Sequence, residues 1–494
     1  MKTRILGSET EYGILAREDL SSDPVSNSLS LIGSCPLIPA THILWDYENE
    51  NPLNDARGFE IEGEKERPGP DYNRLLNKLM FNGGRLYVDG AHPEFSTPEC
   101  LTPREVVAYE KAGERILELS RETCNRTDRR EKRVVLYKNN TDGKGNSYGY
   151  HENYLMERKI PFDRIQAELI PFLVTRQIFT GAGKVGSENH TEPVPYQLSQ
   201  RADFFEVLVD LNTMVKRPIV NTRDEPHSDP SLYRRLHVIV SDSNMSEIST
   251  FLKLGTMLLV LAVIEEESES FGVTLENPVK AIKDISRDLS FKKPVRLKDG
   301  RMTSAFEIQR IYLNRAKRLF SGNHNSYSSE VLDRWESVLR RLEEDPSLLS
   351  REIDWVIKKE MIESFMLRKK CGWSDPRVSL LDLQYHDIST EKGIYYALEK
   401  GGFVDRLLTE EEISRAIENP PEGTRAYFRG TCLKKFPKEI YSASWTSILF
   451  DVGNAEIKKI PIMDPFKGNR QLIEKIMNTS HTARELLNHL SQRT

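Results

Sequence analysis

The sequence predicts an α+β fold with a large domain followed by a smaller one. Its 494 residues exceed what one compact core usually needs. Strand-like segments at residues 4–15, 85–89, 134–138 and 234–240 are mixed with helix-like segments at 103–122, 161–179, 246–267 and 303–370. Residues 418–423 contain two adjacent prolines and a glycine, which interrupt helices and sheets alike. We therefore expect a large domain at residues 1–420 and a small one at 421–494.

Local signals support the individual elements. Pro103 and Pro161 stand near predicted helix starts, and Ser246 opens a long apolar helix. Asp345-Pro346 predicts a break within the helical region 303–370. After the boundary we expect short strands at 448–452 and 457–460 and then a terminal helix. Residues 17–82 form a long polar stretch, whose flanks at 18–39 and 62–71 we predict to be flexible loop, and a loop of this length is usually functional or disordered.

Composition narrows the class of protein. The formal net charge is −5, so the chain has no overall basic excess and we expect no nucleic-acid partner. The longest apolar run, residues 257–264, is far shorter than the ~20 residues of a membrane span, so we interpret it as part of a core helix. The N-terminus shows no apolar secretory segment, and the five cysteines form no CxxC pair. These features predict an intracellular, cytoplasmic protein with reduced thiols.

Carboxylates gather on the first predicted strand. Glu9 and Glu11 share one strand face with Gly7, because side chains alternate along a strand. Two carboxylates about 7 Å apart repel each other unless a cation lies between them. The ordinary alternative is an exposed polar face. Apolar residues at the strand start and the flanking glycines favour a partly buried strand instead.

A second strand repeats this arrangement. Arg85, Tyr87 and Asp89 face one way, and the residues between them face the core. His92 and Glu94 follow directly. A carboxylate, a phenol and an imidazole this close together suit a hard Mg²⁺ ion that also holds phosphate oxygens. The alternative is an edge strand followed by a charged turn.

Further polar groups lie downstream. Residues 148–153 read as a loop that carries His151, and Arg235 and His237 share one face of the strand at 234–240. Arginine side chains bind phosphate oxygens bidentately, so Arg223, Arg235 and Arg429 are candidate phosphate ligands. The ordinary alternative for any single arginine is a surface ion pair. The chain has no GxxxxGK[ST], HExxH or GxSxG motif and no GxGxxG after a predicted strand, and we interpret GAGKVG at residues 181–186 as a turn. The chain thus combines acidic strands and arginines with the absence of a P-loop. This combination favours a binding site in which Mg²⁺ holds a nucleotide against a β-sheet.

Several long motifs resemble the Pup ligase/depupylase family, which is related to glutamine synthetase and glutamate–cysteine ligases. They are RILGSETEYGI, RLYVDGAHPEFSTPE, LYKNNTDGKGNSYGYHENYL, LSQRADF, NTRDEPHSDPSLYRRLHVIVSDSNMSE, ENPPEGTRAYFRG and SASW. The resemblance covers nearly the whole chain in order. It implies a glutamine synthetase-like, curved antiparallel β-sheet cradle backed by helices, with a small C-terminal α/β domain.

The resemblance also implies an activity. One branch of the family joins the C-terminal glutamate of the small modifier Pup to lysines, and the other cleaves that bond and deamidates the C-terminal glutamine of Pup. The segment WDYENENPLNDARGFE at residues 45–60 resembles a depupylase-specific region within 17–82, whereas VSDSNMSE and EIDWVIK are more like the ligases. We therefore expect a depupylase and Pup deamidase, with Pup ligase as the alternative. A non-catalytic module that senses nucleotide or holds Pup is a third hypothesis, which the intact acidic set disfavours.

Residue roles follow from the matched motifs. The resemblance implies that Asp89 is the catalytic residue, either a nucleophile or a general base. It implies that ATP (or ADP) and Mg²⁺ are the cofactors. Partners would be Pup or a Pup-like modifier and pupylated proteins, with a functional link to a bacterial proteasome. Metal and phosphate ligands would be Glu9, Tyr87, Glu94, Glu11, His151 and His237. Nucleotide-binding positions would be Arg85, Thr97 and Trp445, with Arg223, Arg235 and Arg429 as weaker candidates for phosphate or Pup contacts.

Overall fold

A computed structural model describes residues 3–17, 19, 21–63, 67–127, 133–189, 191–213, 215–321 and 326–492. The fold is α+β, as predicted. Its centre is a six-stranded antiparallel sheet, with strands in the order β15-β10-β1-β8-β7-β6. These strands are β15 (Tyr233–Val238), β10 (Tyr150–Glu157), β1 (Leu6–Glu11), β8 (His92–Ser96), β7 (Arg85–Asp89) and β6 (Asn77–Leu79).

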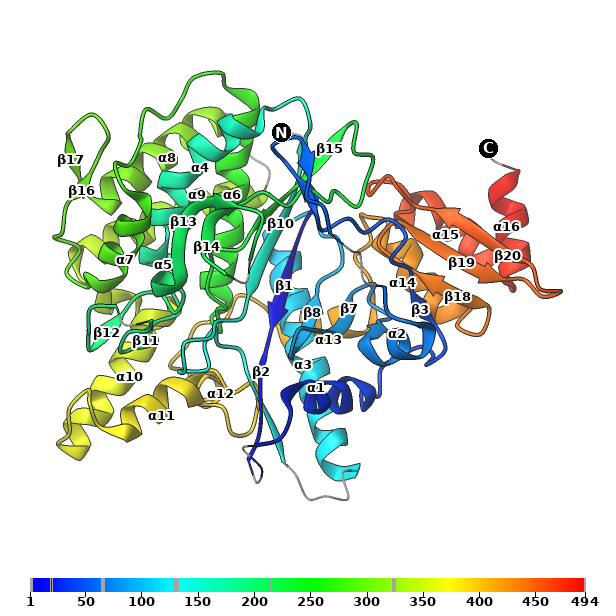
Figure 1. The fold of residues 1–494 in the computed structure, drawn as a ribbon, viewed down its shortest axis with the longest axis horizontal. Helices are drawn as coiled ribbons and strands as arrows, with labels where there is room; N and C mark the ends of the chain where they lie inside the picture. Colours follow the sequence, from blue (N-terminus) through cyan, green and yellow to red (C-terminus); the bar gives the residue numbers. More distant parts are fainter. Residues whose placement is uncertain are drawn as a thin grey trace.

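The two faces of this sheet differ in chemistry. In β1, buried residues alternate with partly exposed ones, so that Leu6 faces the core while Glu9 and Glu11 face the other way, as the sequence predicted. The core face packs against helices that include α3 (Pro103–Thr127) and α6 (Glu247–Glu266). In Figure 1, β1 runs through the middle of the molecule, with the helices of the large core gathered to one side of it. The polar face of the sheet is therefore left to form a site.

Helix α6 is the main core element. It is long and apolar enough to cross a membrane, the only such helix in the described part of the chain, but it is wholly buried within the protein. This confirms the interpretation of residues 257–264 as part of a core helix. The Ser246 side chain caps its start by accepting a hydrogen bond from the Ser249 backbone.

The last part of the chain forms a second sheet, in the order β20-β19-β18-β3. Its strands are β18 (Ile440–Ala443), β19 (Ser447–Asp451), β20 (Ile457–Pro461) and β3 (Leu44–Trp45), and β3 lies parallel to β18. Helices α14 (Ala426–Lys435), α15 (Arg470–Thr479) and α16 (Ala483–Ser491) pack with it, at the orange and red end of Figure 1. The predicted single terminal helix is thus two helices. A boundary at residue 420 stays a prediction, and the second core also recruits Ile43, Trp45 and Leu79.

The other elements belong to the large core or lie at the border of the polar face. They are β2 (Gly13–Ala16), α1 (Pro24–Gly33), β4 (Asn54–Asp55), β5 (Phe59–Glu60), α2 (Pro70–Leu76), β9 (Val134–Tyr137), α4 (Phe162–Thr175), α5 (Gln177–Thr180), β11 (Lys184–Val185), β12 (Tyr196–Gln197), η1 (Ala202–Phe204), β13 (Phe205–Asp210), β14 (Arg217–Asn221), α7 (Pro278–Arg287), β16 (Val295–Arg296), β17 (Met302–Thr303), α8 (Ala305–Phe320), α9 (Ser326–Glu344), η2 (Pro346–Leu349), α10 (Asp354–Lys369), α11 (Pro376–Tyr385), α12 (Ile394–Lys400) and α13 (Glu410–Glu418). The break predicted at Asp345-Pro346 is confirmed, since Asp345 caps the short helix η2.

Two sequence interpretations were wrong. Residues 148–153 are not a loop, because β10 begins at Tyr150 and pairs with both β1 and β15. Alternation of buried and partly exposed residues along β10 is the signal that was missed. The flanks of the 17–82 stretch are not wholly loop either, because α1 and the start of α2 fall within them; residues 18, 20 and 64–66 of those flanks lie outside the described residues.

Candidate active site

A cavity of about 650 Å³ lies over the polar face of the central sheet. Most of the residues singled out from the sequence line it together, although they range along the chain from Glu9 to Trp445. The predicted residues that line it are Glu9, Glu11, Arg85, Tyr87, Asp89, Glu94, His151, Arg223, Arg235, His237 and Trp445.

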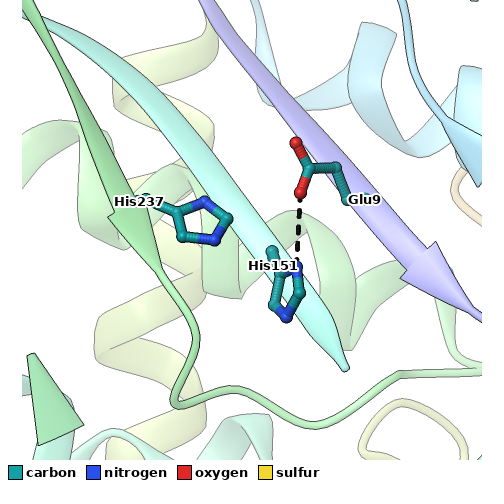
Figure 2. A group of neighbouring side chains, drawn as sticks. All are labelled: Glu9, His151 and His237. Atoms are coloured by element: carbon teal, nitrogen blue, oxygen red, sulfur yellow. Dashed lines mark hydrogen bonds and ion pairs between the residues drawn. The ribbon is translucent and has the colours of Figure 1, made fainter. Parts of the chain in front are cut away.

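The first cluster joins three neighbouring strands. Glu9 of β1, His151 of β10 and His237 of β15 each offer a ligand atom, and these atoms lie within 4.8 Å of one another. Figure 2 shows the three side chains converging from their strands. Nδ1 of His151 is 3.2 Å from Oε2 of Glu9, and the two imidazole rings are 4.9 Å apart at their centres. One carboxylate and two imidazoles form a compact set of metal or phosphate ligands.

Neighbouring groups set the charge of this cluster. Burial alone would raise the pKa of Glu9, but the hydrogen bond with His151 and the charge of Arg235 outweigh it, so that this pKa lies well below its ordinary value. Burial, reinforced by the charge of Arg235, lowers the pKa of His237 well below its ordinary value. Asn153 donates to Oε1 of Glu9 at 3.1 Å and accepts from Arg235 at 2.8 Å. The cluster therefore holds an ionised carboxylate beside a neutral imidazole.

The second cluster is entirely acidic. Carboxylate oxygens of Glu11, Asp89 and Glu94 lie within 4.8 Å of one another. The hydroxyl of Tyr87 donates to Oε1 of Glu94 at 2.5 Å. Asp89 is the last residue of β7 and is exposed, and Gly90 after it turns the chain with a φ of 56°. The turn leaves the Asp89 carboxylate open to the cavity.

Mutual repulsion makes this second cluster a candidate cation site. Burial raises the pKa of Glu94 well above its ordinary value, and the negative charges of Asp89, Glu11 and Glu9 add to the effect. Oε2 of Glu94 is buried and has no hydrogen-bond partner among the described residues, and the same holds for Nε2 of His237. A divalent cation would relieve the repulsion and give both atoms a partner.

Arg85 is held between two aromatic rings. Its guanidinium carbon is 4.0 Å from the centre of the Trp45 ring and 4.1 Å from that of Tyr87. Asn77 accepts from its Nε at 3.0 Å, and Glu50 lies 3.6 Å from its Nη1. This stacking fixes the orientation of the Arg85 guanidinium group on the cavity wall.

Replacing Arg85 with lysine should weaken Mg-nucleotide binding about tenfold, since an ammonium group cannot stack as a planar guanidinium does. Titration of a fluorescent ADP analogue measures this. Arg57→Lys is the matched control, because Arg57 also lies over a ring, that of Phe59, and pairs with Asp55, but does not line the cavity. If the Arg85 variant and the wild type bind the ADP analogue with equal affinity, Arg85 does not contribute to nucleotide binding.

Two predicted residues lie outside the large cavity. Thr97 lines a smaller cavity of about 80 Å³ that it shares with Trp445 and Arg425, and its hydroxyl accepts from the Ser8 backbone at 3.0 Å. Arg429 lines neither of these two cavities. It pairs with the buried carboxylate of Glu99 and lies 4.9 Å from the Trp445 ring, so it supports that ring from behind.

Sequence reasoning missed several cavity residues. Asn153 follows His151 by two positions and therefore shares its strand face, a signal that the loop interpretation concealed. Arg425 lies in the ENPPEGTRAYFRG motif and binds Glu99 at 2.7 Å. The other missed cavity residues are Tyr47, Glu50, Arg201, Arg217, Glu225 and His227, of which Arg217 alone lies outside the motifs and segments quoted from the sequence.

A family model described as "Pup-ligase protein" matches residues 4–449, which include all but the end of the chain. The chain belongs to the Pup-ligase family. A depupylase from Acidothermus cellulolyticus is 45% identical over 98% of both chains, and a Pup deamidase/depupylase from Mycolicibacterium smegmatis is 44% identical over 99% of both. A Pup–protein ligase from Kineococcus radiotolerans is 42% identical over 83% of this chain and 91% of its own.

Solved structures of Pup ligases share the fold of this family member. The complex between Pup and its ligase PafA has a TM-score of 0.80 and 33% identity, covering 100% of this chain and 95% of the other. PafA in complex with ADP has a TM-score of 0.74 and 35% identity, covering 85% of this chain and 95% of the other. The α+β architecture predicted from the family resemblance is confirmed.

Proposed function

We propose that this Pup-ligase family member is a depupylase and Pup deamidase. It would hydrolyse the isopeptide bond between the C-terminal glutamate of Pup, or a Pup-like modifier, and substrate lysines. It would also convert the C-terminal glutamine of Pup to glutamate. Both reactions cleave an amide on the side chain of a C-terminal residue, so one site serves both.

One observation carries this proposal: the similarity to depupylases runs the full length of the chain, at 45% and 44% identity. It therefore includes residues 45–60, the segment that favoured the depupylase branch. Pup–protein ligases match either a smaller share of the chain or at lower identity: one is 42% identical over 83% of this chain and another is 38% identical over 97%. The two ligase structures are 33% and 35% identical.

Residues 45–60 form part of the cavity wall. Tyr47, Glu50 and Pro52 line the cavity. The backbone of Asn51 donates to Glu225 at 2.5 Å, and Thr222 donates to Asp55 at 2.6 Å. The segment is thus attached to the polar chain that precedes β15, where it can shape what enters the site.

The donor set fits Mg²⁺ with ATP or ADP. The carboxylate-rich clusters contain buried side-chain atoms without a hydrogen-bond partner among the described residues, and such clusters suit a hard cation. A Pup ligase of the same fold has been solved in complex with ADP. Glu9, Tyr87 and Glu94 would hold the metal, with Glu11, His151 and His237 completing the metal and phosphate ligands. A bound Mg²⁺ would supply positive charge to the nucleotide and to the developing oxyanion. Burial raises the pKa of Tyr87 well above its ordinary value, so this chain presents it as a neutral phenol.

Asp89 is the residue placed for bond cleavage. As a nucleophile, its carboxylate would attack the amide carbonyl carbon, the C–N bond would break, and the leaving amine would take a proton from the water molecule that then attacks the anhydride. Water would then hydrolyse the resulting anhydride and restore Asp89. As a general base, Asp89 would instead take a proton from the attacking water. Arginines on the cavity wall would stabilise the oxyanion in either case.

Incubation with a pupylated protein tests the function against its alternative. With ATP or ADP present, the depupylase releases free Pup and unmodified protein, and Pup with a terminal glutamine gains one carboxylate. Samples without nucleotide should show far slower release. A Pup ligase would instead form conjugates from Pup-glutamate and a lysine-bearing protein, with ADP release matched to conjugate formation. That outcome would replace the proposed function.

The cellular setting belongs to the same proposal. A depupylase acts on intracellular proteins, so a cytoplasmic location and a functional link to a bacterial proteasome go with it. No disulfide joins the cysteines that the structure describes.

A further inference from the structure

One buried arginine joins the second sheet to the central sheet. Arg429 of α14 is 1% exposed. Its Nε and Nη2 donate to the Gly83 carbonyl at 3.1 and 2.7 Å, and its Nη1 donates to Oε1 of Glu99 at 3.1 Å. Its guanidinium carbon lies 4.9 Å from the centre of the Trp445 ring. The turn between β6 and β7, the segment after β8 and the segment between β18 and β19 therefore meet at a single side chain.

These contacts lie next to the three positions predicted to bind nucleotide. One contacted residue stands two positions before Arg85, another stands two positions after Thr97, and the third is Trp445 itself. Thr97 and Trp445 line the small cavity together with Glu99, whereas Arg429 lines neither the small nor the large cavity. Arg429 therefore lies behind the predicted nucleotide site and outside the space that a ligand would fill.

A second arginine shares the Glu99 carboxylate. Arg425, the residue before α14, is 3% exposed, and its Nε donates to Glu99 at 2.7 Å. Burial alone would raise the pKa of Glu99, but the charges of Arg429 and Arg425 outweigh it and lower this pKa to about 2. A buried ion pair adds little stability compared with apolar packing, and its best-attested use is to fix the register of the elements that it joins. This cluster therefore suits a positioning role.

Helix α14 is also packed directly against the turn between β6 and β7. A Cβ atom on Gly83 would lie 3.1 Å from the backbone oxygen of Ala426, and one on Gly430 would lie 2.4 Å from the carbonyl oxygen of Phe81. Glycine at both positions lets the two backbones approach this closely. Because β7 begins at Arg85, any shift of α14 would also move the strand that carries Arg85.

We propose that Arg429 is a positioning residue for the nucleotide, with Glu99 as its anchor. It sets nucleotide affinity by holding Arg85, Thr97 and Trp445 in one arrangement across the two sheets, and it does not contact the nucleotide itself. This inference rests on the proposed function, because it takes those three residues as the nucleotide site. It gives Arg429 a different role from the contact with phosphate or Pup that the sequence led us to expect.

Arg429→Met tests the proposal. Glu99 keeps Arg425 as its partner in this variant, so the protein is expected to fold, and a melting curve checks this. The dissociation constant of a fluorescent ADP analogue should rise about tenfold or more, as expected when hydrogen bonds to a charged group are lost. In Pup-conjugate cleavage, the KM for nucleotide should rise by a similar factor, and kcat at saturating nucleotide should fall far less.

Arg429→Lys separates positioning from charge. A lysine keeps the positive charge, but one ammonium nitrogen cannot take the place of a planar guanidinium that bonds Glu99 and the Gly83 carbonyl at once. Nucleotide affinity in this variant should therefore be nearly as low as in Arg429→Met.

Arg341→Met is the matched control. Arg341 also joins a carboxylate and a backbone carbonyl: its Nη2 donates to Glu352 at 2.9 Å and its Nη1 donates to the Leu348 carbonyl at 3.3 Å. It lines neither cavity. Its variant should bind the ADP analogue with wild-type affinity, whatever the change in melting temperature.

Each outcome has a separate meaning. If the wild type does not bind the ADP analogue, the nucleotide part of the proposed function fails. If the wild type binds it and Arg429→Met binds equally well, with at most a lower melting temperature, the positioning role is wrong. If Arg429→Lys regains wild-type affinity, charge alone matters, Arg429 acts on the ligand directly, and the inference is overturned. This last comparison also decides the question if Arg429→Met does not fold.

Discussion

Asp89→Asn should lower the rate of Pup-conjugate cleavage by about 1,000-fold or more. An asparagine keeps the shape of the side chain but is neither a nucleophile nor a base at neutral pH. Asp89 is exposed at the end of β7, so the substitution should not unfold the protein. Nucleotide affinity should change much less than the rate, because the nucleotide pocket is assigned to other residues.

The measurement is single-turnover release of Pup from a conjugate, with wild type and variant at equal nucleotide saturation. Asp451→Asn is the matched control, since Asp451 is likewise the last residue of a strand, β19, but lies in the small sheet. Cleavage by the Asp89 variant at the wild-type rate would refute the assignment. Acid quenching and intact mass spectrometry then separate the two roles, because only a nucleophilic Asp89 forms a covalent Pup–enzyme adduct.

Arg176→Met should destabilise the fold by about 3–5 kcal/mol, because it leaves a buried carboxylate without its partner. Glu152 of β10 is 0% exposed, and Arg176 binds it through two nitrogens, one of them at 3.1 Å. Tyr154 and Ser241 also donate to Glu152. Glu152 and His151 lie on opposite faces of β10, so the ion pair supports the strand that carries His151 to the site.

Urea unfolding measures the loss. The control is Arg310→Met, which removes an exposed ion pair with Glu343 and should cost at most about 1 kcal/mol. Arg176→Met combined with Glu152→Leu should recover much of the stability, since no buried charge remains. A loss below about 1 kcal/mol in the single variant would contradict the argument.

The same pair predicts a pH dependence. Burial alone would raise the pKa of Glu152, but Arg176 outweighs it, and this pKa lies below its ordinary value. A lowered pKa in the folded state means that the carboxylate stabilises the fold above its ordinary pKa, and that this contribution is lost as the pH falls through the lowered value. The wild type should therefore lose more stability on acidification than the double variant.

The sequence was most informative where a period of two could be followed along a strand. Glu9, Glu11, Tyr87 and Asp89 were placed on their faces correctly because their strands are regular. The interpretation of residues 148–153 as a loop was wrong because a turn-like glycine, Gly149, and a turn-like asparagine, Asn153, obscure the alternation at the start of β10. That error hid the strand that lies between β1 and β15.

Groups that meet only in the fold could not be predicted from local pattern. The Trp45 ring reaches Arg85 through a two-residue strand, too short to give a periodic signal. Arg201 and Arg217 share only Ser147 as a visible link, and no spacing rule connects those three positions. Family resemblance supplied residue roles, but the contact that these two arginines share with Ser147 is visible only in three dimensions.

The parallel pairing of β3 with β18 constrains how the protein assembles. His42, just before β3, lies 3.1 Å from the carbonyl of Ile440, a separation of 398 positions along the chain. Closing so long a loop carries an entropic cost, and contacts of high sequence separation slow folding. During synthesis on the ribosome, β3 is made early, but it cannot pair until its partner strand β18 has been made, when nearly all of the chain is complete. The wall of the active site at Arg85, which the Trp45 ring supports, is therefore among the last parts to become native, and catalytic competence is delayed until synthesis is nearly complete.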